Sequence, residues 1–378
     1  MKALGPGSTI GVLGGGQLGR MMAIEARRMG YRVVVLDPSA RCPTAQVADG
    51  VVVGALDDLE SAKHLARQVD VITLDTEHVP SELLAELEKL VPVRPGASVL
   101  GTINDRQVQK QFLDRIGLPQ AAWAPASTEG ELAAALGTLG RPAIVKVRSL
   151  GYDGKGQVRI EESGDPNAEL AKLRGAPAVA EELVRFKREI SVILARGGTG
   201  EIKIYPIAEN VHRRHILHTT RAPAPMAAAT QKRAEEIGVT VAEQLGHIGV
   251  IAVELFELVD GRLLVNEIAP RTHNSGHYTW GACVTSQFEQ HVRAVCGQPL
   301  GDPRPMSGAV MVNLIGDLWH AGPPSWQPVL ERPEARLHLY GKDLAAPGRK
   351  MGHVLLLDDD TDRALGTADQ LITTLSRA

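Results

Sequence analysis

The sequence predicts a mixed α/β and α+β protein, and three features of the chain support that fold class. The chain opens with a strand, a glycine turn, a helix and a second strand, which is typical of a parallel sheet. Its middle contains two strands joined by a glycine-rich loop, and its C-terminal half contains an Asp-Gly hairpin, both typical of antiparallel pairing. A length of 378 residues is enough for two or three domains.

Composition and charge limit the classes of function. Hydrophobic residues make up 44% of the chain and charged residues 22%, as in an ordinary globular protein. A net charge of −3 argues against electrostatic binding of nucleic acid or an anionic membrane. Cys42, Cys283 and Cys296 lack CxxC spacing, which indicates free thiols in a reducing compartment. The chain shows neither signal-peptide architecture nor an apolar run of membrane-spanning length, so we expect a cytoplasmic protein.

The first βαβ unit contains a glycine turn. A strand is predicted over Thr9–Leu13, a turn over Gly14–Gly19, a helix over 20–29, and a second strand over 31–36 that ends at Asp37. The GxGxxG spacing, with an acid about twenty residues later, matches the dinucleotide fingerprint, so NAD with Asp37 on its ribose is one interpretation. The other is that the turn and the helix N-terminus hold a different anion or polar ligand.

Two acids follow the next predicted strand of this domain. Asp75 and Glu77 come directly after the strand over 69–74, at the edge where open α/β sheets bind ligands. Loop acids near the start of a helix are the alternative interpretation.

A glycine-rich loop in the middle of the chain is predicted to cover phosphates. A strand over 143–148 contains Lys146, and the loop over 149–157 contains Lys155 and three glycines in six residues. The GxxxxGK[ST] pattern is absent and a strand follows the loop, which excludes a Walker P-loop. A simple hairpin with a glycine-rich tip is the alternative. An acidic strand over 178–184 would complete a small α+β domain.

A hairpin around Asp260-Gly261 brings two carboxylates together. If the turn has two residues of type I′, Glu254 lies directly opposite Glu267 on one face of the ribbon. At ~5 Å and an effective dielectric of about 20, their repulsion is roughly 3 kcal/mol. Either one carboxylate is protonated or a cation such as Mg²⁺ lies between them. Splayed side chains on a solvated face are the alternative.

Histidines cluster twice in the C-terminal half. His212, His215 and His218 have a spacing that invites zinc, but no Cys or Glu completes a site, which favours surface histidines. His273 and His277 are separated by Asn-Ser-Gly, which favours a polar ligand loop over a helix that binds metal.

Taken together, these features resemble the ATP-grasp superfamily. Finer matches are similar to the N5-carboxyaminoimidazole ribonucleotide synthase family over essentially the whole chain. They are QLGR at 17–20, DR at 105–106, GYDGKGQ at 151–157, NEIAPRTHNSGH at 266–277 and PGRKMGH at 347–353. The chain departs from the family at 75–78, where Asp-Thr-Glu-His replaces a Glu-Phe-Glu-Asn run.

The resemblance implies a fold and a reaction. The implied ATP-grasp fold has a Rossmann-like domain over 1–104, an α+β lid domain over 105–185, and a catalytic domain with a substrate-binding segment over 186–378. The implied reaction uses ATP and bicarbonate to carboxylate 5-aminoimidazole ribonucleotide through carboxyphosphate, in purine biosynthesis. A homodimer that uses Mg²⁺ is also implied.

The resemblance also assigns roles to individual residues. The implied Mg²⁺ ligands are Glu254 and Glu267. The implied catalytic residues are Asp153, Lys155 and Arg271, with Asp153 as the group that handles the amine proton. The implied ATP-binding residues are Arg106, Lys146, Gly151, Tyr152, Asp153, Gly154, Lys155, Gly156, Gln157, Glu181, Glu182, Leu183, Val184, Glu189, His212, Asn266 and Glu267. The implied substrate-binding residues are Gln17, Leu18, Glu77, Tyr152, Asp153, Arg271, His273, Asn274, Ser275, Lys342 and Arg349, the last pair on the 5′-phosphate.

Three other functions compete with this interpretation. An NAD-dependent oxidoreductase has no use for the lid loop or the carboxylate hairpin. A non-catalytic nucleotide-binding regulator should lack the complete carboxylate and basic-turn sets. Another ATP-grasp ligase, such as the formate-dependent glycinamide ribonucleotide transformylase, is separated by the substrate motifs alone.

Overall fold

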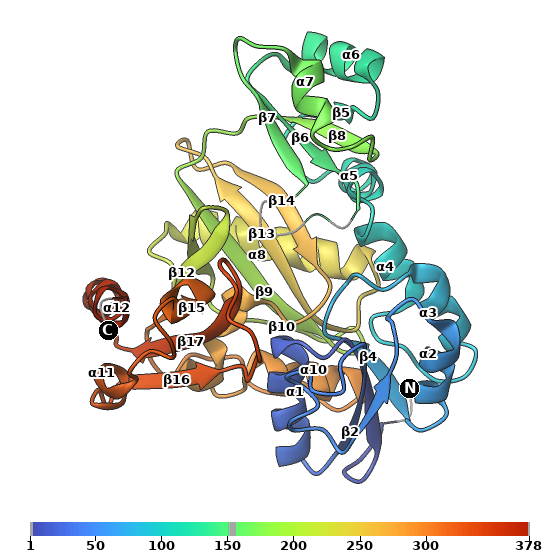
Figure 1. Cartoon of the computed structure of the whole chain (residues 1–378), viewed down its shortest axis with the longest axis vertical. Helices are drawn as coiled ribbons and strands as arrows, with labels where there is room; N and C mark the ends of the chain where they lie inside the picture. The colour runs from blue at the N-terminus through green and yellow to red at the C-terminus, as the bar shows by residue number, and fades with distance from the viewer. Residues whose placement is uncertain (1–2, 150, 152–155, 377–378) are drawn as a thin grey trace.

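The computed structural model describes residues 3–149, 151 and 156–376, and within those ranges the strands form three sheets. Figure 1 shows the small sheet of β5 to β8 at one end of the molecule and the N-terminal parallel sheet toward the other. The large antiparallel sheet lies between them and continues into the C-terminal strands. None of the helices in this described part combines the length and the apolar character needed to cross a bilayer.

The N-terminal sheet is parallel, with the strand order β3-β2-β1-β4. Its strands are β1 (Thr9–Leu13), β2 (Arg32–Asp37), β3 (Gly50–Val53) and β4 (Val71–Leu74). The helices of this region are α1 (Gln17–Arg28), α2 (Leu59–Ala66), α3 (Ser81–Leu87) and α4 (Ala97–Ile103). The apolar runs of β1 and β4 are buried along their whole length, as in parallel sheets covered on both faces. The predicted βαβ opening is confirmed, although α1 begins at Gln17 rather than at Arg20.

The middle sheet is antiparallel, with the strand order β5-β8-β6-β7. Its strands are β5 (Trp123–Pro125), β6 (Ala143–Val147), β7 (Gln157–Ile160) and β8 (Ala178–Glu182). The helices are α5 (Arg106–Arg115), α6 (Glu129–Leu139) and α7 (Pro166–Ala171). Asp105 caps α5 by accepting hydrogen bonds from the backbone N–H groups of residues 107 and 108. Since β8 ends at Glu182, the predicted strand over 178–184 is too long, and Leu183 and Val184 lie beyond it.

The large sheet is antiparallel, with the strand order β14-β13-β9-β11-β12-β15-β17-β16, and β10 also pairs with β9. Its strands are β9 (Arg188–Arg196), β10 (Ile202–Ile204), β11 (Ala208–Arg213), β12 (Ile216–Ala222), β13 (Gly249–Glu257), β14 (Leu263–Ala269), β15 (Ala309–Ile315), β16 (Ala335–Leu339) and β17 (Lys350–Leu357). Pro206 separates β10 from β11, so these are two distinct strands. Proline has no N–H to donate to a sheet ladder.

Helices cover both faces of this large sheet. The α-helices are α8 (Ala228–Gln244), α9 (Thr279–Ala282), α10 (Gln287–Val295), α11 (Gln327–Leu330) and α12 (Thr361–Leu375), and the 3₁₀ turns are η1 (Asn274–Gly276) and η2 (Gly316–Trp319). On β9, Val192 and Leu194 pack in one core with α8, whereas Ile193 and Ala195 pack in another with α10. This alternation is the period of two expected of a strand buried on both faces. Helix α10 also packs against α1, so it joins the large sheet to the N-terminal domain.

In the hairpin of β13 and β14 the turn differs from the predicted one, but the predicted pairing of Glu254 with Glu267 is present. Its loop has three residues rather than two, because the N–H of Leu258 donates to the carbonyl of Arg262, and Gly261 takes a φ of +83°. A β-bulge then inserts Asn266 as an extra residue on β14. The bulge shifts the register by one residue, so Glu254 pairs with Glu267 after all.

Candidate active site

A cleft of about 800 Å³ takes residues from α1 and the segment after β4, from the middle sheet and from the large sheet. This volume suits a nucleotide together with a second small substrate. The predicted site residues in its wall are Gln17, Leu18, Glu77, Arg106, Lys146, Gly151, Gly156, Gln157, Glu189, His212, Glu254, Asn266, Glu267, Arg271, His273, Asn274, Lys342 and Arg349. The predicted residues outside this wall are Glu181, Glu182, Leu183, Val184 and Ser275. The predicted residues Tyr152, Asp153, Gly154 and Lys155 lie outside the described residues.

The glycine turn at one end of the cleft is filled by the protein's own carboxylates. The Asp75 carboxylate accepts hydrogen bonds from the N–H groups of Gly16 at 3.0 Å and Gly19 at 2.6 Å, and Asp37 accepts one from Gly15 at 2.8 Å. A Cβ on Gly16 would lie 2.6 Å from the Asp75 carboxylate, which explains the need for glycine there. Asp75 therefore occupies the helix N-terminus that a dinucleotide pyrophosphate would need, and the NAD interpretation is wrong.

Glu77 lies against Arg271, which comes from the segment after β14. The guanidinium donates two parallel hydrogen bonds to the carboxylate, one of them from Nη2 at 2.8 Å. Burial by itself would raise the pKa of Glu77, but the charge of Arg271 outweighs it and holds the pKa at about 2. The altered run over 75–78 thus retains a carboxylate that orients Arg271 toward the cleft wall.

Glu181 is buried behind the cleft wall, where three cations surround its carboxylate. Its carboxylate lies 2.8 Å from Lys146 Nζ, 3.3 Å from Lys110 Nζ and 3.9 Å from an Arg106 guanidinium nitrogen. Burial would raise the pKa of Glu181, but the three cations outweigh burial and hold the pKa at about 2. The carboxylate therefore fixes Lys146 and Arg106, both of which line the cleft. Lys110 was missed by the sequence reasoning, although it follows Arg106 by four residues on the same helical face.

The carboxylates of Glu254 and Glu267 face each other across the hairpin, so like charges lie together here, whereas Glu181 is surrounded by cations. Burial and then the facing Glu267 raise the pKa of Glu254 to about 7. Close by, His212 Nδ1 lies 2.6 Å from Glu189 Oε2, and this contact raises the pKa of His212 against the effect of burial. His212 and His215 both line the cleft, although the His215 side chain is exposed, and His218 is buried, so the spacing was wrong to favour three surface histidines.

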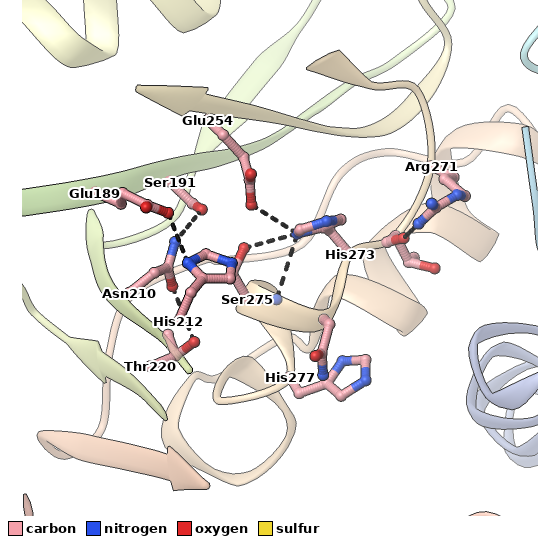
Figure 2. Close-up of polar contacts among 12 residues, drawn as sticks. Glu189, Ser191, Asn210, His212, Thr220, Glu254, Arg271, His273, Ser275 and His277 are labelled. Carbon is pink, nitrogen blue, oxygen red and sulfur yellow. Dashed lines mark hydrogen bonds and ion pairs between the residues drawn. The ribbon is translucent and has the colours of Figure 1, made fainter. Parts of the chain in front are cut away.

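His273 lies between the carboxylate hairpin and Arg271, as Figure 2 shows. Its Nδ1 lies 2.8 Å from Ser275 Oγ and 3.7 Å from Glu254 Oε1. The N–H of Ser275 also donates to Nδ1, so the ring proton lies on Nε2. Burial first, and then the charge of Arg271, lower the pKa of His273 to about 3, which keeps the ring neutral.

The other polar residues of this loop are occupied by the protein itself. The amide of Asn274 exchanges two hydrogen bonds with the amide of Asn313, at 3.1 and 2.7 Å. Ser275 is fully buried beneath His273, and His277 is fully buried outside the cleft wall. The loop therefore supports His273 through contacts within the protein, and its role as a polar ligand loop stays a prediction.

A basic group closes the end of the cleft that faces the N-terminal domain. Lys342 Nζ donates to the Lys350 carbonyl at 2.6 Å and lies 5.6 Å from the centre of the Tyr340 ring. Arg349 Nη1 donates to the Leu344 carbonyl at 2.8 Å. Lys342, Arg349 and Lys350 all line the cleft, and the sequence reasoning missed Lys350 although it lies inside the PGRKMGH motif. A guanidinium and ammonium groups gathered in this way suit a phosphate.

Within residues 3–149, 151 and 156–376, no group of three or more His, Cys, Asp or Glu side chains is arranged to hold a metal ion by itself. The Glu254 and Glu267 pair still fits Mg²⁺, which is commonly bound by one or two carboxylates together with substrate phosphates. Hard oxygen donors that repel each other in the absence of a cation are the observation that supports this fit.

Three domain families match successive parts of the chain. The ribonucleotide synthetase preATP-grasp domain matches residues 7–104, and the ATP-grasp domain matches residues 111–288. The phosphoribosylaminoimidazole carboxylase C-terminal domain matches residues 309–367.

Individual relatives match along nearly the whole chain. The chain is 47% identical over 354 residues to the N5-carboxyaminoimidazole ribonucleotide synthase of Brucella melitensis, covering 93% of this chain and 97% of the relative. A crystal structure of an N5-carboxyaminoimidazole ribonucleotide synthetase with ADP gives a TM-score of 0.93 at 40% identity over 98% of both chains. The Aspergillus clavatus enzyme, solved with ADP and 5-aminoimidazole ribonucleotide, gives 0.90 at 33% identity over 98% of this chain and 99% of that one.

Proposed function

The chain belongs to the N5-carboxyaminoimidazole ribonucleotide synthase family, and we propose that the cleft lined by residues of its N-terminal region, middle sheet and large sheet is the reaction site. The chain is an ATP-dependent ligase with the ATP-grasp fold, and it carboxylates 5-aminoimidazole ribonucleotide in purine biosynthesis. One observation carries the assignment of the site. The carboxylate pair of Glu254 and Glu267 and the basic group around Lys342 and Arg349 line one continuous cleft.

Bicarbonate is the proposed source of the carboxyl group. A bicarbonate oxygen attacks the γ-phosphorus of ATP, the bond to the β-phosphate bridging oxygen breaks, and ADP leaves. The carboxyphosphate formed then loses phosphate as the substrate amine attacks its carbon, and the proton that the amine gives up leaves with that phosphate. Such phosphoryl transfer depends on positioning and on charge neutralisation more than on covalent help from the protein.

The nucleotide half of the cleft is assigned to the hairpin and the lid. Lys146 and Arg106, fixed by Glu181, would neutralise the phosphates, and Glu189 would meet the ribose. Glu254 and Glu267 would hold Mg²⁺, which when bound screens the phosphate charge against the incoming nucleophile. Residues 105–185 form the proposed lid domain, between the N-terminal domain over 1–104 and the catalytic region over 186–378. The assignments of Asp153 and Lys155 remain predictions.

The substrate half is assigned to the residues between His273 and Arg349. Lys342 and Arg349 would bind the 5′-phosphate. Arg271, held by Glu77, would bind bicarbonate or carboxyphosphate. The neutral His273 would donate a hydrogen bond from Nε2 at the same place.

Phosphate release from ATP tests this assignment. We expect release that requires Mg²⁺ and that rises when 5-aminoimidazole ribonucleotide and bicarbonate are added together, compared with either alone. Formate with glycinamide ribonucleotide should give no increase, which separates the related ligase. Tight binding of NADH without binding of ATP would contradict the proposal.

A cytoplasmic homodimer is also proposed. Cys42, Cys283 and Cys296 are buried free thiols, which suits a reducing compartment. Light scattering of the purified protein tests the dimer, and a monomer mass across the working concentration range would contradict it.

A further inference from the structure

The first residue of α10 grips the loop that presents His273. Gln287 is fully buried, and its side-chain Oε1 accepts the backbone N–H of His273 at 3.0 Å. Its Nε2 donates to the backbone carbonyl of the same residue at 2.7 Å and lies 3.2 Å from His277 Nδ1. Both backbone groups of His273 are therefore held by one side chain that lies fourteen residues further along the chain.

The orientation of this amide is unambiguous, and the loop is shaped to receive it. A backbone N–H can only donate and a carbonyl can only accept, so the oxygen and the nitrogen of Gln287 are assigned by their partners. A Cβ on Gly276 would lie 2.4 Å from Gln287 Oε1, so the loop can approach only with glycine there. The N–H of Gln287 also donates to Thr279 Oγ1, which donates to the carbonyl of Gly276.

We propose that Gln287 is a positioning residue for carboxylation, which sets the place of the His273 ring by holding its backbone. This inference rests on the proposed function of the cleft. Gln287 is absent from the cleft wall, so it acts through His273 rather than on the substrate. The ring it positions lies 3.7 Å from Glu254 and follows Arg271 by two residues, so a shift of the loop disturbs the part of the cleft assigned to bicarbonate.

The same helix contains a matched control. Gln290 is also fully buried, and its amide grips the backbone of Gly301 in the same way. Its Oε1 accepts the N–H of Gly301 at 2.6 Å and its Nε2 donates to the carbonyl at 3.0 Å. Gly301 lies outside the cleft wall. The two glutamines therefore share helix, burial and bonding pattern, and they differ in the loop that they hold.

Kinetics of Gln287→Leu and Gln290→Leu test the proposal, alongside melting temperatures. Both variants lose a buried amide, so we expect similar falls in Tm. Gln287→Leu should lose about 10- to 100-fold in kcat/KM for 5-aminoimidazole ribonucleotide, because misplacing a reacting group by about 1 Å costs up to that factor. Its KM for ATP should stay within about twofold of wild type, and Gln290→Leu should keep wild-type kinetics. Equal kinetic losses in both variants, or none in either, would overturn the positioning role.

Gln287→Glu gives a second test that does not depend on the leucine variant folding. An ionised carboxylate accepts from the N–H of His273 but repels its carbonyl, whereas a neutral carboxyl group accepts and donates as the amide does. The ratio of variant to wild-type kcat/KM should therefore rise as the pH is lowered. A ratio that does not change with pH would contradict the proposal. Wild-type protein without substrate-stimulated phosphate release would instead overturn the proposed function, and the two failures are distinguishable.

Discussion

Glu181 and Glu254 are two glutamates at the same cleft whose surroundings have opposite effects. Glu181 lies among Lys146, Lys110 and Arg106, which hold its pKa at about 2. Glu254 faces Glu267 across a bulged hairpin, and burial together with that neighbour raises its pKa to about 7. The negative charge of Glu181 is balanced by cations of the protein before any ligand binds. The ionised form of Glu254, by contrast, becomes stable when a cation is supplied from outside.

The difference shows that the two walls of the cleft have different electrostatic roles. Glu181 holds cations in place for phosphates, so its role is to support other side chains. Glu254 and Glu267 repel each other electrostatically, and a bound divalent cation would relieve that repulsion. The same contrast is found between two glutamates of one strand. Glu257 lies on the same strand as Glu254 and is buried, but it pairs with Lys187 and Arg188.

The largest effect is expected at the hairpin. Glu267→Gln removes a proposed ligand of Mg²⁺, so turnover should fall by about 10³-fold or more, as when a charge-stabilising group is lost in phosphoryl transfer. The fold should keep its stability without metal, because the repulsion with Glu254 is relieved. Steady-state phosphate release and a thermal melt in EDTA measure the two halves. Activity within tenfold of wild type would remove Glu267 from the metal site.

Glu181→Gln should destabilise the protein by about 3–5 kcal/mol, because it leaves the buried Lys110 and the half-buried Lys146 and Arg106 without the anion between them. Chemical denaturation measures the change. Glu182→Gln is the matched control, because the neighbouring carboxylate accepts one hydrogen bond from the N–H of Ala122, which a glutamine oxygen can also accept. Equal effects of the two substitutions would show that the cluster contributes nothing to stability.

Glu254→Gln should act with the opposite sign in metal-free protein. Folding raises the pKa of Glu254 from 4.5 to about 7, so the ionised group destabilises the native state progressively as the pH rises through that window. The variant should therefore match wild type below pH 4.5 and exceed it by up to about 3 kcal/mol above pH 7.

Denaturation in EDTA across this pH range checks the prediction, with Glu257→Gln as a control on the same strand that should lower stability. Addition of Mg²⁺ and ADP should favour wild type again, because the variant lacks one ligand. A gain in stability that is constant from pH 4 to pH 8 would disprove the titration of Glu254.

The smallest of these effects is expected at the basic end of the cleft. Arg349→Ala should raise the KM for 5-aminoimidazole ribonucleotide about tenfold to a hundredfold, since a charge-assisted hydrogen bond contributes roughly 1.5–3 kcal/mol. The KM for ATP should change little. Arg336→Ala is the control, because that side chain is exposed on β16 and donates to nearby carbonyls. An equal rise in both constants would move Arg349 away from the substrate phosphate.

Predictions from the sequence were correct where residues close together in the chain determine the structure. Strand alternation and the Asp-Gly turn predicted the hairpin and the pairing of Glu254 with Glu267, but the pairing was correct only because two errors cancel. The predicted turn was one residue too short, and the predicted register lacked the bulge at Asn266. Turn length depends on the backbone of Gly261, whereas the bulge depends on contacts made along both strands.

Sequence reasoning failed where a polar group finds its partner far along the chain. The GxGxxG spacing predicted the turn but not its occupant, because Asp75 reaches Gly16 and Gly19 from 59 and 56 residues away. Nothing in the run over 75–78 indicates that Glu77 meets Arg271, which is 194 residues distant. These pairings follow from how the domains pack, and no local pattern encodes them.

By itself the sequence determined the succession of strands, helices and turns, and the motifs that identify the family. Those features depend on backbone preferences and side-chain periods that act over a few residues. The tertiary structure alone decided which carboxylates have their negative charge balanced by nearby cations and which do not. It placed Lys110 beside Glu181 and Gln287 behind His273. Charge and hydrogen-bond partners depend on distance in space, and that distance exists only after the three sheets have packed together.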